Sequence, residues 1–389
     1  MTMLIPGDVG ELAAMIGAAT ESGRRLEIGA GGSKAAIGAA RPGAEPLSMA
    51  GFSGIVDYDP AELTLTARAA TPLAEVEALV ASEGQMLAFE PFDHGPLFGE
   101  AAGLATIGGV VAAGVSGSRR VSAGAARDHL LRVEAVSGRG EAFVAGARVV
   151  KNVTGYDLPK LMCGSWGRLA ALTEVTLKVL PRPPASTTLV WPDLAPEAAS
   201  RAMLAAMGST AAVSAAAHLP GLWGHGAITA LRLEGVAPSI EARIETLSAL
   251  ALAPAPFDLL DAARADELWD GLRTCAPLGG ALPLWRVHLP AKAWPALVAA
   301  MAPFEGRWMV DWAGSLVWLA SAAPGEAIRA AAGAAGGHAM LVRGGAEGGD
   351  VLVFHPPPAP VAALEARLRR AFDPRRVFET GRFGVDDAD

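Results

Sequence analysis

The first half of the chain alternates short apolar runs with glycine-containing breaks. A helix is expected over residues 8–21, because Leu12, Ile16 and Ala19 recur at helical spacing behind the capping residue Asp8. A second helix is expected over 71–80, where Thr71-Pro72 opens it. Alternating apolar and polar positions predict strands at 26–28, 63–69, 85–90, 130–136, 140–144 and 172–180. The first half is therefore expected to mix strands and helices.

From Ser186 onward, strands alternate with alanine-rich helices. The pattern predicts strands at 186–191, 211–217, 227–234, 257–260, 284–289, 308–311, 315–319 and 338–342. It predicts helices at 196–207, 240–252, 294–301 and 326–335, with a further helix at 261–275 in the middle. This order is βαββαβ twice, so we infer a duplicated architecture without a repeated residue motif. Two such units would build one antiparallel sheet with helices on one face.

Composition and charge narrow the functional classes. The 389 residues suffice for two or more domains, and 51% hydrophobic residues with 46 Gly and 28 Pro indicate a globular, turn-rich chain. The net charge of −8 argues against non-specific binding to nucleic acid or to an anionic membrane. The longest uncharged stretch, 202–231, contains glycines and a proline and makes a poor membrane span, and no signal peptide is expected.

The cysteines and histidines predict no metal site. Cys163 and Cys275 cannot supply four thiolates to an iron–sulfur cluster, and no histidines have metal-ligand spacing. Any redox metal must therefore belong to a partner. So few cysteines also fit a reducing compartment.

Two glycine-rich segments carry the candidate chemistry. A short strand breaks into glycines at 29–34, and a longer stretch, 105–128, combines five glycines with Arg119, Arg120 and Arg127. Glycine allows backbone to approach another body closely, and exposed N–H groups beside arginines favour an anion. A phosphate-bearing cofactor is the simplest interpretation, although the first segment alone could be an ordinary turn between strands.

Four motifs in fixed order carry a family resemblance. GAGGS at 29–33, ATIGGVVA at 105–112, RRVSAGAARD at 119–128 and KNVTGYDLPKLMCGSWGRLAALTEVTLKVLPRP at 151–183 resemble the FAD-binding domain of the vanillyl-alcohol oxidase/PCMH flavoprotein family. The last motif is most similar to the FAD-binding (E) subunits of bacterial glycolate oxidases. The resemblance implies an α+β fold that begins with a PCMH-type FAD-binding domain over 1–184. A cap domain over 185–355 would follow, and its large antiparallel sheet, built from two βαββαβ units, would form a lid over the flavin. A C-terminal helix and tail over 356–389 would return to the FAD domain.

The same resemblance implies a set of FAD-binding residues. Main-chain N–H groups would hold the pyrophosphate at Gly29, Ala30, Gly31, Gly32 and Ser33. Residues beside the pyrophosphate and flavin would be Thr106, Gly108 and Gly109, and those near the ring Ser116, Gly117 and Arg119. A turn behind the cofactor would contain Asn152, Thr154, Gly155, Tyr156 and Asp157. The adenine end would be lined by Gly164, Gly167, Leu172 and Val175.

Some of these residues have structural alternatives, and three positions depart from the family pattern. Asp157 could simply cap a helix or turn, and Tyr156 could be a buried ring with one satisfied hydroxyl. Ser33 and Lys34 stand where relatives that attach FAD covalently carry a histidine, so we expect this chain to bind FAD non-covalently. Trp166 replaces a common glutamate, and Glu379-Thr380 replaces an asparagine-proline pair, which puts the usual polar contacts there in question.

The second half offers candidates for substrate chemistry. Arg273 or Arg286 could hold a substrate carboxylate, and His288, on the same strand face as Arg286, could take a proton. A lone histidine on a strand is also commonly a structural residue.

The resemblance implies a function in a complex. It implies the FAD-binding subunit of a glycolate oxidase that oxidises glycolate to glyoxylate beside a larger flavin subunit and an iron–sulfur subunit, in the cytoplasm or held at a membrane by those partners. The alternatives are a self-sufficient FAD-dependent dehydrogenase for a lactate-like 2-hydroxy acid and a subunit whose FAD is purely structural.

Overall fold

The chain divides into two compact units. The computed structural model describes residues 3–38, 43–149, 156–221, 226–250, 252, 256–344 and 352–384. Unit 1 contains Met1–Ser116, Gly124–Pro181 and Pro356–Asp389, and unit 2 contains Gly117–Ala123 and Arg182–His355. The C-terminal segment therefore belongs with the first half of the chain, and the short segment Gly117–Ala123 belongs with the second half. The functions that we attach to 1–184, 185–355 and 356–389 stay predictions.

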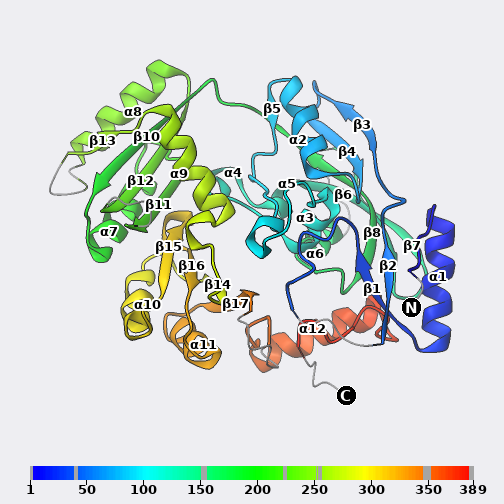
Figure 1. The fold of residues 1–389 in the computed structure, drawn as a ribbon. Coiled ribbons are helices and arrows are strands. Elements are labelled where there is room, and N and C mark those ends of the chain that lie inside the picture. Colours follow the sequence, from blue (N-terminus) through cyan, green and yellow to red (C-terminus); the bar gives the residue numbers. More distant parts are fainter. Residues whose placement is uncertain are drawn as a thin grey trace. The chain divides into compact units, whose positions relative to one another are not determined.

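Unit 1 is built on a five-stranded antiparallel sheet in the order β3-β4-β8-β6-β7 (Figure 1). Its strands are β3 (Ile55–Asp59), β4 (Thr64–Arg68), β6 (Leu130–Ser137), β7 (Ala142–Gly146) and β8 (Ala170–Lys178). The central strand β8 is buried along almost its whole length, as expected for a strand covered on both faces. The buried hydroxyls of Thr66 and Thr176 satisfy each other across β4 and β8 at 2.9 Å.

A parallel pair, β1 (Arg25–Gly29) and β2 (Ala44–Ser48), lies beside α1 (Val9–Ser22). Asp8 caps α1 by accepting from Glu11 N at 2.8 Å, and Gly23 ends it with a φ of 68°, so the expected helix is confirmed. The apolar face of α1 packs into a core with Leu26 and Leu47 of the two strands. That packing fixes β1, which leads directly into the first glycine loop.

The remaining elements of unit 1 are short, apart from the last helix. They are α2 (Leu73–Ser82), β5 (Gln85–Met86), η1 (Gly95–Phe98), α3 (Ile107–Ala113), α5 (Ala126–His129), α6 (Leu158–Met162), β9 (Leu180–Pro181) and α12 (Ala359–Phe372). The strand expected over 85–90 is wrong beyond Met86, because Leu87 O accepts from Glu90 N in a turn where Glu90 has a φ of 50°. The pattern also missed α3, since its Gly-Gly pair lowers helix propensity.

Unit 2 contains an eight-stranded antiparallel sheet in the order β13-β10-β12-β11-β15-β16-β14-β17 (Figure 1). Its strands are β10 (Ala185–Pro192), β11 (Ala215–Pro220), β12 (Ala227–Gly235), β13 (Asp258–Leu259), β14 (Leu284–His288), β15 (Arg307–Asp311), β16 (Leu316–Ala320) and β17 (His338–Arg343). Each half of the sheet consists of four strands that are consecutive in the chain. From the outer edge to the centre, each half contains its fourth, first, third and second strand, and β11 pairs with β15 at the centre. The expected duplication is confirmed. One strand is shifted from 211–217, because Ala212 turns the chain with a φ of 46°.

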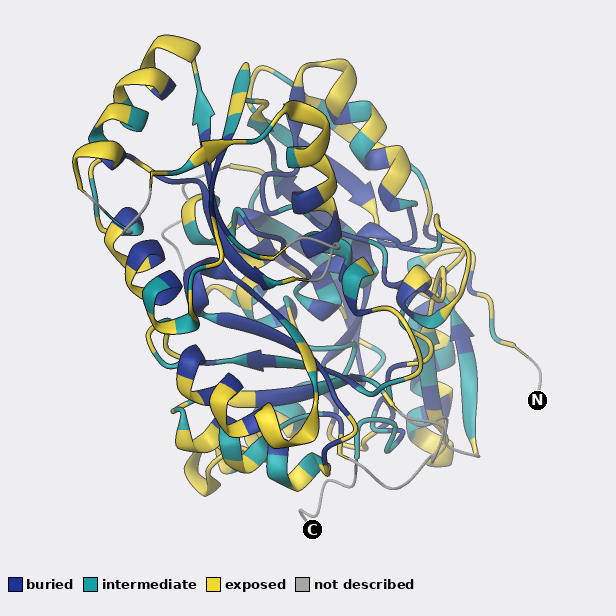
Figure 2. Cartoon of the chain, turned by 60° about the vertical axis from the view of Figure 1, so that its left-hand side comes forward, coloured by how far each residue is buried: buried dark blue, intermediate teal, exposed yellow. Residues whose placement is uncertain are grey.

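Helices cover one face of this sheet. They are α7 (Pro196–Met207), α8 (Ala237–Ala249), α10 (Trp294–Met301) and α11 (Gly325–Ala334), and each places buried residues in the core that contains Leu189 and Trp285. In Figure 2 the strands are mostly dark blue while the helices carry yellow outer faces. On the other face α9 (Ala262–Thr274) is anchored by Trp269, whose Nε1 donates to Thr188 Oγ1 at 2.9 Å. The short helices α4 (Arg120–Ala123), η2 (Ala276–Leu278), η3 (Ala302–Phe304) and η4 (Trp312–Gly314) complete unit 2.

Candidate functional site

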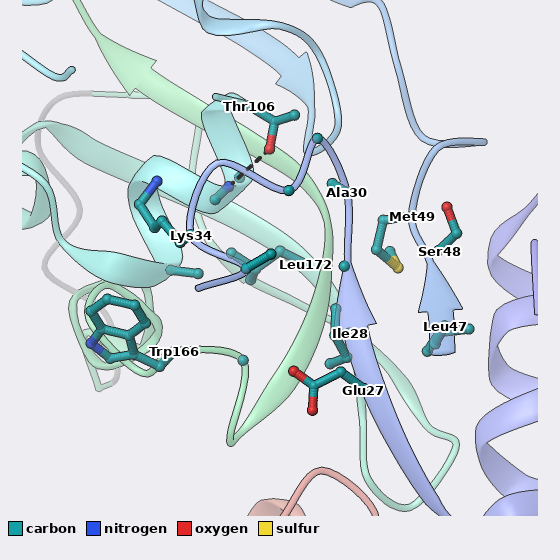
Figure 3. Close-up of a pocket in the computed structure, with 18 of the residues that line it drawn as sticks. Glu27, Ile28, Ala30, Lys34, Leu47, Ser48, Met49, Thr106, Trp166 and Leu172 are labelled. Carbon is teal, nitrogen blue, oxygen red and sulfur yellow. Dashed lines mark hydrogen bonds between the residues drawn. The ribbon is translucent and has the colours of Figure 1, made fainter. Parts of the chain in front are cut away.

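A pocket of about 370 Å³ in unit 1 gathers segments from across its sequence. Its walls come from the end of β1 with the following glycine loop, the end of β2, the start of α3, the start of β8 and the C-terminal tail (Figure 3). The glycine loop curves past Thr106 and Lys34, while Trp166 and Leu172 lie along the pocket and Met49 stands across from Ala30. One pocket therefore unites the first glycine loop with the later motifs.

The glycine loop is shaped for an anion. A Cβ on Gly31 would lie 1.9 Å from Leu104 O, so only glycine lets the loop lie against that backbone. Gly32 has a φ of +86°, which L side chains rarely adopt. Within the described chain, none of the backbone N–H groups of residues 30–34 donates to a protein acceptor. Free N–H groups converging from a tight loop fit a diphosphate, so this loop can hold the phosphates of a dinucleotide.

The start of α3 forms the second wall of the pocket. Thr106 accepts from Gly109 N at 3.3 Å as the helix cap. Gly108 donates to Ala69 O at 2.8 Å, and a Cβ there would lie 2.6 Å from that same oxygen. The two glycines thus let α3 pack directly on the chain that follows β4 while leaving its first turn open to the pocket.

Lys34 places a buried ammonium group in the pocket. Its Nζ lies 3.3 Å from Ser33 Oγ, and burial lowers its pKa to about 8 although Asp93 acts in the opposite direction. Asp93 is itself fixed, because its carboxylate accepts from Gly103 N at 2.8 Å and Leu104 N at 2.9 Å. An uncompensated buried ammonium is unfavourable, so the lysine favours a bound anion.

The C-terminal tail closes the same pocket. Arg382 pairs with Glu27 of β1 and donates to Ile37 O at 2.7 Å, beyond the glycine loop. The aromatic rings of Trp166 and Phe383 meet edge to face, with 5.6 Å between their centroids. Trp166 has a φ of 56°, unusual for a bulky residue, and strain of this kind concentrates at functional sites. At the position where many relatives have a glutamate, this chain therefore lines the pocket with the apolar ring of Trp166.

Half of the predicted cofactor residues line this pocket. They are Gly29, Ala30, Gly31, Gly32, Ser33, Thr106, Gly108, Gly109, Gly167 and Leu172. The pocket brings together residues that stand as far apart in the sequence as Gly29 and Leu172.

The residues predicted near the flavin ring have other contacts. Ser116 Oγ accepts from Ala126 N at 3.0 Å. Gly117 and Arg119 fall in the segment that belongs to unit 2: Gly117 O accepts from Trp312 Nε1 at 2.9 Å, and Arg119 Nε lies 2.9 Å from Glu234 Oε2. Their role at the ring stays a prediction.

The later motif is only partly within the pocket. Asn152, Thr154 and Gly155 lie outside the described residues. Asp157 caps α6 by accepting from Lys160 N at 3.3 Å, which is the structural alternative. Tyr156 is 94% exposed, so the alternative of a buried ring is wrong. Gly164 donates to Val111 O at 3.0 Å, and Val175 is fully buried in β8.

The catalytic candidates belong to unit 2. Arg286 and His288 share one face of β14 while Trp285 and Val287 join the core on the other, as the alternation predicts. Burial, Arg286 and His338 hold the pKa of His288 well below its ordinary value, so this imidazole is neutral at pH 7. Arg273 lies on α9 and pairs with Asp270 at 2.6 Å. The structure thus groups Arg286 with His288, and it gives Arg273 a partner on its own helix.

Sequence reasoning did not assign Lys34, Asp93, Trp166 or Arg382 to the site. The signal for Lys34 was its place directly after the glycine loop, and Trp166 stood out only as a departure from the family pattern. Asp93 and Arg382 carried no local signal, since their roles depend on segments distant in the sequence.

Comparison with known proteins identifies the class. The family model described as an FAD binding domain matches residues 2–146. Glycolate oxidase subunit GlcE of Escherichia coli (strain K12) is 36% identical over 359 residues, which covers 92% of this chain and 92% of that protein. The chain is an FAD-linked oxidoreductase, and its cofactor is FAD. It belongs to the flavoprotein family that includes glycolate oxidase subunit GlcE.

Other relatives match a smaller part of the chain. The D-lactate dehydrogenase of Anaerostipes hadrus is 34% identical over 146 residues, which covers 38% of this chain and 29% of the relative. A solved structure of p-cresol methylhydroxylase with substrate bound superposes with a TM-score of 0.72 at 13% identity, and covers 99% of this chain and 89% of that one. The expected PCMH-type α+β fold is therefore confirmed across both units.

Two features are absent from the described residues. None of their helices is both long and apolar enough to cross a bilayer. In the same part of the chain, no three His, Cys, Asp or Glu side chains come together as a metal-binding group.

Proposed function

We propose that this chain is the FAD-binding subunit of a glycolate oxidase, which converts glycolate to glyoxylate and passes electrons through FAD to partner subunits. The observation that carries the proposal is the relationship to subunit GlcE, which extends over 92% of both chains and so spans both units. The match to the D-lactate dehydrogenase covers only 38% of this chain, and therefore gives less support to a self-sufficient enzyme.

The pocket of unit 1 supports non-covalent FAD binding. The N–H groups of Ala30 to Lys34 would hold the diphosphate, with the Lys34 ammonium beside them. Trp166 and Leu172 would give an apolar surface to a flat ring, the adenine in the arrangement predicted from the family. Bound there, FAD supplies a two-electron acceptor for the hydride that leaves the hydroxyl-bearing carbon of the substrate.

The partners would be a larger flavin subunit and an iron–sulfur subunit, and we place the complex in the cytoplasm or at a membrane through those subunits. In this arrangement, electrons that leave FAD would be carried onward by metal centres outside this chain. A subunit with purely structural FAD is the competing possibility.

An anaerobic absorption experiment tests the proposal. The FAD-loaded chain, alone and in complex with its co-purified partners, is mixed with glycolate while flavin absorbance is followed. We expect acid precipitation to release all the flavin, and glycolate to bleach the flavin of the complex. A Gly109→Trp variant, which fills the first turn of α3, should lose FAD and the activity of the complex. Full activity without FAD would support a structural role instead, and a complex that takes up no FAD would overturn the proposal.

A further inference from the structure

A second pocket lies wholly within unit 2, where β14 ends and β17 begins. It has a volume of about 460 Å³, and the residues that give it chemical character are Arg120, His288, Trp312, Ser315 and His338. None of the described residues that line it is acidic. Cationic and neutral polar groups thus face one opening.

Arg286 does not itself line the pocket, but it lies two residues before His288 on β14, on the same face of the sheet. Its guanidinium carbon is 5.2 Å from the centroid of Trp312 and 5.8 Å from that of Trp318. Aromatic rings attract a cation but accept no ordinary hydrogen bond, and Nε of Arg286 is buried with no partner among the described atoms. A buried donor without an acceptor is costly, so this arginine is set up to receive one.

The pocket concentrates positive charge. Arg120 lies over the same Trp312 ring, 4.2 Å from its centroid. Burial and, after it, the charge of Arg120 together lower the pKa of Arg286 to about 10. Two guanidinium groups near one indole ring thus give this end of the pocket positive charge.

The histidines add neutral hydrogen-bonding groups. The rings of His288 and His338 stack with 5.1 Å between centroids and 9° between planes, and burial holds both pKa values below the ordinary value. Asp311, next to Trp312, is engaged by Trp312 N at 2.7 Å and by the hydroxyl of Ser118 at 2.8 Å. The carboxylate of Asp311 therefore already accepts hydrogen bonds from these two donors.

We propose that this pocket, the unit 2 anion pocket, binds a small organic monocarboxylate of the 2-hydroxy- or 2-oxo-acid class. Arg286 and Arg120 would hold the carboxylate, whose planar oxygens match a guanidinium edge. Ser315 and the neutral His288 would hydrogen-bond the 2-hydroxyl or 2-oxo oxygen. Leu289 and Pro290 complete the wall with apolar surface, which disfavours a ligand with several anionic groups. The choice of acid class rests on the proposed function; the anion site does not.

Calorimetric titration of the FAD-loaded chain with glycolate, glyoxylate and inorganic phosphate tests the site. We expect both acids to bind more tightly than phosphate. Arg286→Gln should weaken acid binding by at least about tenfold, since a charge-assisted pair is lost, and Arg286→Lys should recover part of it. The matched control is Arg329→Gln: Arg329 also lies over a tryptophan of this sheet, 5.0 Å from Trp285 on the opposite face, and should bind acids as the wild type does.

The outcomes separate this proposal from the proposed function. Absence of acid binding, tighter binding of phosphate, or equal loss in Arg286→Gln and Arg329→Gln would overturn the anion pocket. In the assembled complex, Arg286→Gln should raise KM for glycolate more than it lowers kcat, because a binding contact is removed. A complex that binds the acids but does not oxidise glycolate would refute the proposed function and leave the pocket standing.

Discussion

Arg168 and Glu379, which are 211 positions apart in the sequence, form a partly buried ion pair: Nε and a terminal nitrogen of Arg168 lie 3.2 and 2.6 Å from one oxygen of Glu379. Arg369 of α12 reaches the same oxygen at 3.3 Å. The neighbours of Glu379 in the tail, Phe378 and Thr380, both line the pocket of unit 1. This ion pair therefore fixes the segment that closes the proposed FAD site.

Glu379→Gln should weaken FAD binding by about tenfold, or about 1.4 kcal/mol, because the tail loses its charged anchor. Titration of the FAD-free protein by flavin fluorescence measures the change. Arg24→Gln is the control: it removes the more exposed pair with Glu45, whose side chains are 43% and 24% exposed, and should leave FAD affinity unchanged. Equal affinities for wild type and Glu379→Gln would show that the tail does not form the site.

Gly31→Ala should abolish FAD binding and destabilise unit 1 by about 2 kcal/mol or more, since the new methyl group would overlap Leu104 O. Urea unfolding and flavin retention on gel filtration measure the two effects. The matched variant is Gly29→Ala, where a Cβ meets no atom within 4 Å and which should unfold like the wild type in the absence of FAD. If Gly31→Ala kept its stability, the close approach of loop and backbone would be wrong.

Local sequence signals predicted the elements well where capping and periodicity agree. The helices at Pro196–Met207 and Trp294–Met301 match expectation at both ends, because each begins with proline in its first turn and then follows one apolar face. The glycine loop was predictable for a similar reason: several glycines directly after a strand indicate a close backbone approach or a positive φ. The β2 strand was missed, since AEPLS carries a proline and does not alternate clearly.

The rest of the site depends on long-range contacts that no local pattern encodes. Arg382 reaches Lys34 O and Ile37 O from more than 340 positions away. The family resemblance places Arg119 near the flavin ring, yet its guanidinium pairs with Glu234, 115 positions further on. Such pairings become visible only when the sheets are assembled.

Arg119→Gln should destabilise unit 2 by about 2 kcal/mol at pH 7, because a largely buried partner of Glu234 is removed. Burial raises the pKa of Glu234, but the hydrogen bond from Arg119 and the charges of Arg232 and Arg119 outweigh it, so the pKa lies below its ordinary 4.5. A carboxylate with a depressed pKa stabilises the fold above that ordinary value and loses the contribution as pH falls through the folded pKa. The difference between variant and wild type should therefore shrink below about pH 4.5 in urea unfolding. A difference independent of pH would contradict this.

The buried Lys34 should make FAD binding dependent on pH. Its pKa of about 8 in the FAD-free protein is low because of burial, and a neighbouring diphosphate would raise it. Below pH 8 the ammonium is charged with and without FAD, so affinity should be constant there. Above it, FAD must bind together with a proton, so affinity should fall by up to tenfold per pH unit. Fluorescence titrations between about pH 6.5 and about pH 9.5 measure this slope. Lys34→Met should bind FAD more weakly at pH 7 without that slope, and Lys34→Arg should keep the affinity across the range, since arginine stays charged. The same slope in Lys34→Met would assign the proton to another group and remove Lys34 from the diphosphate site.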